Sequence, residues 1–157
     1  MNIVKVIQQE SKKYLNHVAI RETISSFTYE QLFENIKDIS QKLENKEIKK
    51  YARVALLCPD GADYIILVLA ILSLNAVAVP INLNSSKKEI NRIIDEMKIE
   101  YFIFDETLYD SNEKHVPFFI SYKKHSFAIQ HLNKKLTEQN EFESLNPAFI
   151  RFTSGTT

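Results

Sequence analysis

The last residues of the chain combine hydroxyl side chains with a glycine, directly after an apolar segment that we predict to be a β-strand, Ala148–Phe152. Hydroxyl groups donate hydrogen bonds, and a glycine lets backbone N–H groups converge, so a loop of this composition is suited to hold phosphate oxygens. A plain solvated loop has the same composition. Both interpretations are open for the residues concerned, which are Thr153, Ser154, Gly155, Thr156 and Thr157.

The other reactive side chains have simpler structural explanations. Asp60 and Asp63 stand at the expected start of a helix, where capping and the helix dipole account for acidic residues. Cys58 ends a predicted buried strand, which favours an unreactive core thiol. The histidines show neither the i, i+4 spacing nor the H-E-x-x-H pattern of a metal site. We therefore predict no metal ligands among His17, His115, His125 and His131.

Two helix starts are marked by capping boxes. Thr28 is followed by Gln31, and Ser86 is followed by Glu89, so each hydroxyl can accept from the third residue of its helix while that residue reaches back. Apolar residues then recur at helical spacing. We predict helices over residues 28–44 and from Ser86 through Met97.

A strand, a helix and a second strand follow one another between these two helices. Val54–Cys58 is apolar on both faces, as expected of a central strand covered by helices on both sides. A nearly all-apolar helix over residues 61–74 leads to a strand over Ala76–Ile81. Asn75 stands where the helix needs a left-handed residue, and asparagine tolerates that conformation. The three elements form a βαβ unit with parallel strands.

The remaining pattern extends this unit into an α/β layered domain with a parallel sheet and flanking helices. We predict a first helix over Asn2–Leu15. Short β pieces are expected at residues 19–21 and 26–27, and strands at residues 101–104, 118–120, 127–129 and 148–152. Parallel strands over residues 53–58, 76–81 and 101–104 would form the core of the sheet.

Composition excludes several classes of protein. The chain has 157 residues, of which 45% are hydrophobic and 25% charged, as in a globular domain. Twenty basic residues balance twenty acidic ones, so no single-sign field favours nucleic acid. One cysteine excludes an internal disulfide, and the start of the chain lacks a signal peptide pattern, so we expect a cytoplasmic protein. The uncharged stretch from Tyr64 to Ser86 is broken at Asn75 and Pro80, which argues against a transmembrane segment.

Three segments together resemble one family. Residues 149–157 look like the opening of the phosphate loop of the adenylate-forming (AMP-forming) synthetase superfamily, which includes acyl-CoA synthetases and nonribosomal adenylation domains. Phe27–Leu32 resembles the Thr-Tyr-x-x-Leu signature of that family. Leu72–Asn82 resembles its Leu-x-x-Gly-Ala-x-x-x-Pro-Leu-Asn segment, with Asn75 in place of the glycine. Asn146 stands where the family often has aspartate.

The resemblance implies that residues 1–157 are the N-terminal portion of an AMP-binding (adenylation) domain, without the rest of the large domain and the mobile C-terminal domain. Residues 153–157 would hold the phosphates of ATP with Mg²⁺, and this fragment would contain no catalytic residue. The implied parent enzyme is an ATP-dependent ligase that activates a carboxylic acid, such as a fatty acid, as acyl-AMP.

The resemblance further implies that the acyl group passes to a thiol. CoA is the first choice of acceptor, as in an acyl-CoA synthetase. The alternatives are an adenylation domain that charges a carrier protein and a truncated noncatalytic module. Taken alone, the fragment is expected to be inactive and to self-associate through an exposed sheet face.

Overall fold

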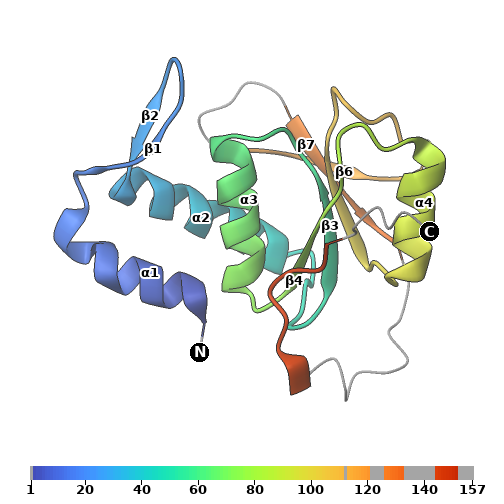
Figure 1. The fold of residues 1–157 in the computed structure, drawn as a ribbon, viewed down its shortest axis with the longest axis horizontal. Coiled ribbons are helices and arrows are strands. Elements are labelled where there is room, and N and C mark those ends of the chain that lie inside the picture. The colour runs from blue at the N-terminus through green and yellow to red at the C-terminus, as the bar shows by residue number, and fades with distance from the viewer. Residues whose placement is uncertain (1, 112, 121–125, 133–143, 152–157) are drawn as a thin grey trace.

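The computed structural model describes residues 2–111, 113–120, 126–132 and 144–151. They form an α/β fold in which helices flank a central sheet (Figure 1). The helices are α1 (Ile3–Ser11, continued by a 3-10 turn at Lys12–Tyr14), α2 (Tyr29–Glu44), α3 (Ala62–Ser73) and α4 (Lys87–Glu96). The strands are β1 (Val18–Arg21), β2 (Ser26–Thr28), β3 (Arg53–Leu57), β4 (Val77–Pro80), β5 (Tyr101–Asp105), β6 (Val116–Phe119) and β7 (Ser126–His131).

The central sheet has five strands in the order β4-β3-β5-β7-β6. Strands β4, β3 and β5 are parallel, which confirms the predicted parallel core. Strands β7 and β6 continue the sheet in antiparallel fashion, so the sheet as a whole is mixed. Only six residues separate β6 from β7, and a connection of that length suits an antiparallel pair, because a parallel crossover needs about a dozen residues or more.

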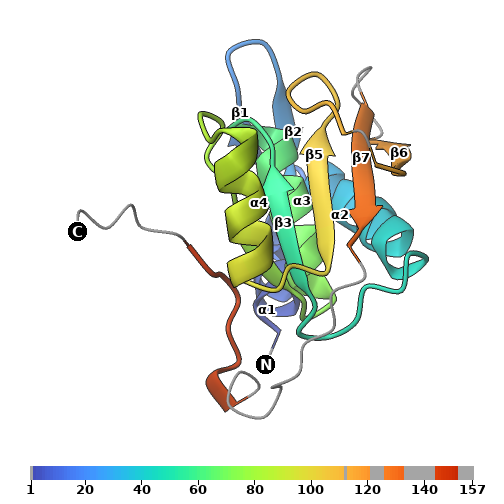
Figure 2. The same cartoon turned by 90° about the vertical axis from the view of Figure 1, so that its right-hand side faces the viewer.

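Helices cover both faces of the sheet. Side chains of α2 and α3 pack with Val54 and Leu56 on one face, and those of α4 pack with Ala55 and Leu57 on the other. Figure 2 shows α4 on the near side of the sheet, with α2 and α3 behind it. Alternate residues of β3 thus enter different cores, which explains why this strand is apolar on both faces.

The predicted capping boxes are present at two helices. At α2, the Gln31 backbone N–H donates to Thr28 Oγ1 at 3.3 Å and the Thr28 N–H donates to Gln31 Oε1 at 3.0 Å. The corresponding bonds join Ser86 and Glu89 at α4. The motifs are local in sequence, so these two helix starts follow from the sequence alone.

The start of α3 differs from the prediction. Asp60 does not cap this helix, whose N-cap is Gly61 with no side-chain capping bond of its own. Instead the Ala62 N–H donates to Glu22 Oε1 at 2.9 Å. The prediction was wrong because a carboxylate from the turn between β1 and β2 already occupies the place that a local cap would take.

The uncharged stretch from Tyr64 to Ser86 divides into α3, a left-handed residue and β4. Asn75 has φ 55°, which confirms its predicted role at the end of α3. Among the described residues, no helix is long and apolar enough to cross a membrane.

Candidate functional site

The carboxyl ends of β3 and β4 form the most distinctive edge of the sheet. The two strands are neighbours and parallel, but the connection after β3 leads to α3 and the connection after β4 leads to α4. Those helices lie on opposite faces, so the two connections diverge. Open α/β sheets bind ligands in the crevice that such a divergence creates.

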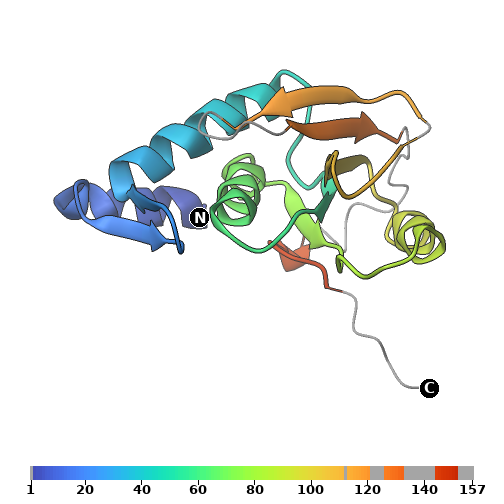
Figure 3. The same ribbon diagram turned by 90° about the horizontal axis from the view of Figure 1, so that it is seen from above.

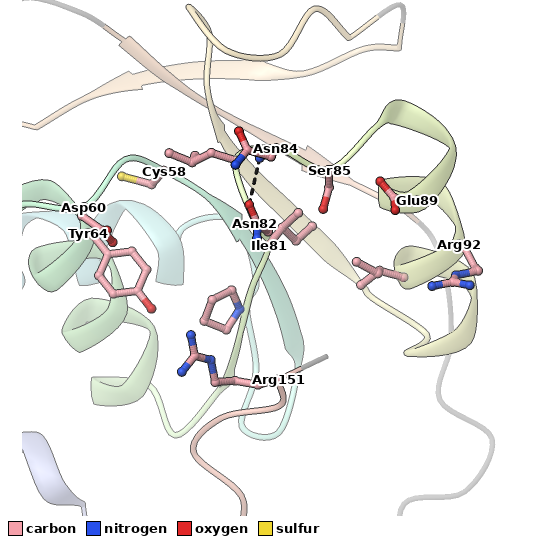
Figure 4. A pocket seen from close by; sticks show the side chains of 13 residues that line it. Cys58, Asp60, Tyr64, Ile81, Asn82, Asn84, Ser85, Glu89, Arg92 and Arg151 are labelled. Carbon is pink, nitrogen blue, oxygen red and sulfur yellow. Dashed lines mark hydrogen bonds between the residues drawn. The ribbon is translucent and has the colours of Figure 1, made fainter. Parts of the chain in front are cut away.

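A cavity of about 810 Å³ lies at this edge (Figure 4). We call it the crevice. Its walls come from the ends of β3 and β4, from α3 and α4, and from the segment near the C-terminal end of the described chain. The lining residues are Cys58, Asp60, Tyr64, Pro80, Ile81, Asn82, Leu83, Asn84, Ser85, Glu89, Arg92, Ile93 and Arg151.

The segment before the predicted phosphate loop runs along the outer edge of β4. The Ala78 N–H donates to Ala148 O at 2.9 Å, and the Ile150 N–H donates to Ala78 O at 3.0 Å. Ala78 and Phe149 thereby form a parallel bridge, in place of the full strand predicted over residues 148–152. Because this segment runs in the direction of β4, it brings Arg151 to the crevice.

The predicted phosphate-binding residues themselves, Thr153, Ser154, Gly155, Thr156 and Thr157, lie outside the described residues. Their role stays a prediction. The described chain reaches Arg151, two residues before Thr153, and Arg151 is at the carboxyl end of β4. Open α/β sheets bind ligands at that edge.

Two polar side chains lie together on the α3 side of the crevice. The Tyr64 hydroxyl points toward the Arg151 guanidinium (Figure 4). Burial raises the pKa of Tyr64, and Asp60 adds to this effect while the Arg151 guanidinium opposes it. The Tyr64 hydroxyl is therefore protonated at neutral pH and can donate a hydrogen bond. Among the described residues, no carboxylate forms an ion pair with Arg151, whose guanidinium carries five N–H donors.

Other polar residues of the crevice are engaged in the structure of its rim. The Asn84 N–H donates to Asn82 Oδ1 at 2.9 Å, which fixes the turn after β4. The hydrogen bond from the Ser86 backbone lowers the pKa of Glu89, so this carboxylate belongs to the capping box of α4. Arg92 lies 3.9 Å from Glu96 in an exposed ion pair. Tyr64 and Arg151 are therefore the crevice residues best placed to meet a ligand.

Sequence reasoning did not predict that Tyr64 and Arg151 lie together. Tyr64 was part of an apolar helix and Arg151 was part of a predicted strand, 87 positions later. The available signal was that both lie near the carboxyl ends of predicted strands, Tyr64 after Val54–Cys58 and Arg151 within Ala148–Phe152. Of the other candidate residues, Cys58 lines the crevice and Asp63 is buried in the first turn of α3. The crevice lining includes none of His17, His115 and His131, and His125 is not among the described residues.

A protein-family model described as AMP-binding enzyme matches residues 7–157. A polyketide synthase-nonribosomal peptide synthetase, phmA of Phaeosphaeria nodorum, is 25% identical over 156 residues, which are 99% of this chain and 4% of that protein. A 2-succinylbenzoate–CoA ligase of Bacillus cereus is 26% identical over 144 residues, 90% of this chain and 28% of that protein. The chain thus spans only a small part of the curated relatives that it matches.

The fold matches a solved structure of the same kind. The N-terminal subdomain of Klebsiella oxytoca NpsA, in complex with 3-hydroxybenzoyl-AMSN, superposes with a TM-score of 0.66 at 24% identity. The match covers 71% of this chain and 28% of that chain. It bears out the predicted fold class, a sheet with flanking helices as in the N-terminal part of an adenylate-forming enzyme.

Proposed function

The chain belongs to the AMP-binding enzyme family, and on that premise we propose that the protein that carries it is an ATP-dependent ligase which activates a carboxylic acid as an acyl-adenylate. The observation that best supports this proposal is the course of residues 148–151 along β4, which brings Arg151, two residues before the Thr-Ser-Gly-Thr-Thr sequence, to the crevice. We further propose that residues 1–157 are the N-terminal portion of an adenylation domain.

In the proposed reaction, a carboxylate oxygen attacks the α-phosphorus of ATP in line while pyrophosphate leaves. The carboxylate is ionised at neutral pH, so this step needs no general base. The protein must instead position two anions and stabilise charge on the leaving group. Mg²⁺ bound to the phosphates would neutralise part of that charge.

We assign the phosphate contacts to Thr153–Thr157. Their hydroxyl and backbone N–H groups would bind the β- and γ-phosphates, and Gly155 would allow the backbone to approach. Arg151, at the crevice, adds a positive charge on the approach to this loop. None of these residues transfers a proton, so their contribution is binding and orientation.

The thiol that accepts the acyl group has two candidates. We place CoA first, in an enzyme of acyl-CoA synthetase type, and the relationship to 2-succinylbenzoate–CoA ligase supports this choice. A carrier protein is the second candidate, supported by the relationship to nonribosomal peptide synthetases. Carboxylate-dependent exchange followed by addition of CoA or of a carrier domain would separate the two.

Carboxylate-dependent exchange of pyrophosphate into ATP tests the proposal in the protein that carries this chain. Ser154→Ala removes a donor and Gly155→Val adds a Cβ where the backbone approaches phosphate. We expect each to lower exchange by about 100-fold or more, the usual effect of losing such a contact. Ser40→Ala removes a hydroxyl of α2, a helix that contributes no lining residue to the crevice, and should exchange at the wild-type rate. Unchanged exchange in both loop variants would remove the phosphate-loop assignment, and a wild-type protein without exchange would favour a noncatalytic module.

A further inference from the structure

The start of α3 is capped by a side chain from another element. Glu22 lies in the turn between β1 and β2, 40 residues before Ala62, and its Oε1 accepts the Ala62 N–H at 2.9 Å. Its other oxygen, Oε2, accepts the Ser25 hydroxyl at 2.7 Å. The turn itself is closed by a bond from the Glu22 N–H to Ser25 O at 2.8 Å. The carboxylate is thus held at both oxygens and carries negative charge to the positive end of the helix dipole.

Gly61 is matched to this contact. Its φ of +143° lies in a region that side-chain-bearing residues rarely adopt. A Cβ built at this position would lie 2.8 Å from Glu22 Oε1. The glycine therefore serves both the backbone turn before α3 and the close approach of the carboxylate.

The capped segment is also a wall of the crevice. Cys58 and Asp60 belong to the connection from β3 to α3, and Tyr64 is in the first turn of α3, and all three line the cavity. Asp60 is exposed and does not cap the helix, so the side-chain cap at this point comes from outside the segment. Its anchor is Glu22, which does not line the cavity itself.

We propose that Glu22 is a positioning residue, whose carboxylate fixes the connection from β3 to α3 and thereby places Asp60 and Tyr64 at the crevice. The significance of the crevice for ATP and the acid rests on the proposed function. The placement of this wall does not depend on the proposed function, and it can be measured in the 157-residue chain without an activity assay.

Cys58 supplies the probe, because it is the only cysteine in the sequence and is buried in the wall itself. Cys58 is 5% exposed, so we expect a thiol reagent such as 5,5′-dithiobis(2-nitrobenzoate) to react slowly while the segment keeps this conformation and faster when it opens. We expect Glu22→Ala to raise the labelling rate about tenfold, which corresponds to a local opening that is easier by about 1.4 kcal/mol. Amide hydrogen exchange at Ala62 should accelerate in parallel.

Two conservative variants separate reach from charge. Glu22→Asp keeps the charge but shortens the side chain, and it should label nearly as fast as Glu22→Ala. Glu22→Gln keeps the length and an acceptor oxygen for Ala62, and it should stay within about threefold of the wild type. These variants also carry the test if Glu22→Ala does not fold.

Thr28→Ala is the matched control, because it removes the cap of α2 without touching the connection after β3. It should lower the melting temperature by a few degrees, as Glu22→Ala should. Labelling rates are compared at equal temperature intervals below each melting temperature, where only Glu22→Ala and Glu22→Asp should be fast. Equal rates for Thr28→Ala and Glu22→Ala would mean that Glu22 acts through global stability, and a wild-type rate for Glu22→Asp would mean that the contact does not hold the wall. Either result would overturn the proposal.

Discussion

At the scale of single residues, Asn75 shows how one side chain serves two elements. Its backbone adopts φ 55° directly after α3, and its Oδ1 accepts a hydrogen bond from Asn2 Nδ2 at 2.9 Å. Asn2 also caps α1 through its own Oδ1, which accepts from the Val4 N–H at 3.0 Å. The sequence predicted the left-handed conformation of Asn75, because that depends on local geometry. It could not predict the contact with Asn2, which is 73 positions away.

Substitutions at Asn75 should separate these two contributions. Asn75→Ala loses both the tolerance for positive φ and the bond to Asn2, so we expect it to lower the free energy of unfolding by about 1–2 kcal/mol. Asn75→Gly loses only the bond and should cost less than about 1 kcal/mol. Asn45→Ala is the control, because Asn45 ends α2 at φ −64° and needs no left-handed residue. Urea unfolding measures all three, and equal stability of the alanine and glycine variants at position 75 would contradict this account.

At the scale of elements, local signals predicted what local contacts determine. The helices α2 and α4 begin at capping boxes, and the strands β3, β4 and β5 follow from apolar runs separated by helices. The start of α3 was mispredicted because its cap comes from Glu22, and no motif near Asp60 indicates this. The position of β7 between β5 and β6 also depends on contacts that are not local, because β7 pairs with β5 rather than only with its neighbour in sequence, β6.

The junction between β3 and β5 carries a pH-dependent prediction. The Arg53 N–H donates to Glu100 Oε1 at 3.3 Å, and burial raises the pKa of Glu100 above its ordinary value of 4.5. Because its pKa is raised, Glu100 stays protonated to a higher pH in the folded state than in the unfolded state. The stability of the folded protein therefore falls as the pH rises from 4.5 through the raised pKa. Burial lowers the pKa of Arg53, so desolvation disfavours the charged forms of both side chains at this junction.

Glu100→Gln keeps an acceptor for the Arg53 N–H but cannot ionise. We therefore expect the variant to gain stability relative to the wild type as pH rises from below 4.5 to neutrality. The gain should stay below about 1 kcal/mol, because Glu100 is only half-buried and water screens its charge. Urea unfolding at several pH values measures the difference, with Glu96→Gln on the exposed face of α4 as the control. A stability difference that is flat with pH, or that falls, would contradict the assigned direction.

At the scale of the whole molecule, the exposed apolar sheet face that we expected is reduced to one edge of the described sheet. Helices cover both faces of the described sheet, and the exposed large apolar side chains of its strands lie on the edge strand β6. Strand β6 lies beside the C-terminal end of α2 (Figure 3). Val116 and Phe119 of β6 are exposed there and line a groove of about 400 Å³ between helix and strand. Sequence reasoning anticipated an apolar surface but could not locate it, because the position of β6 at the edge depends on the pairing of the whole sheet.

We predict that the 157-residue chain self-associates weakly through this margin. Phe119 is 53% exposed, and burying a phenylalanine side chain contributes about 1.5–3 kcal/mol when complete, so one such contact supports only a weak dimer. Strand addition is disfavoured, because Pro117 lacks an N–H and Lys42 Nζ already donates to Phe119 O at 2.9 Å. Side-chain burial should therefore dominate the contact.

Sedimentation velocity over a range of concentrations should show an average mass that rises with concentration, and Phe119→Ser should reduce that rise. Ile24→Ser removes a side chain that is 97% exposed in the β1–β2 turn and should leave it unchanged. A chain that stays monomeric throughout, or one whose association responds equally to both substitutions, would show that this margin of the sheet does not drive association.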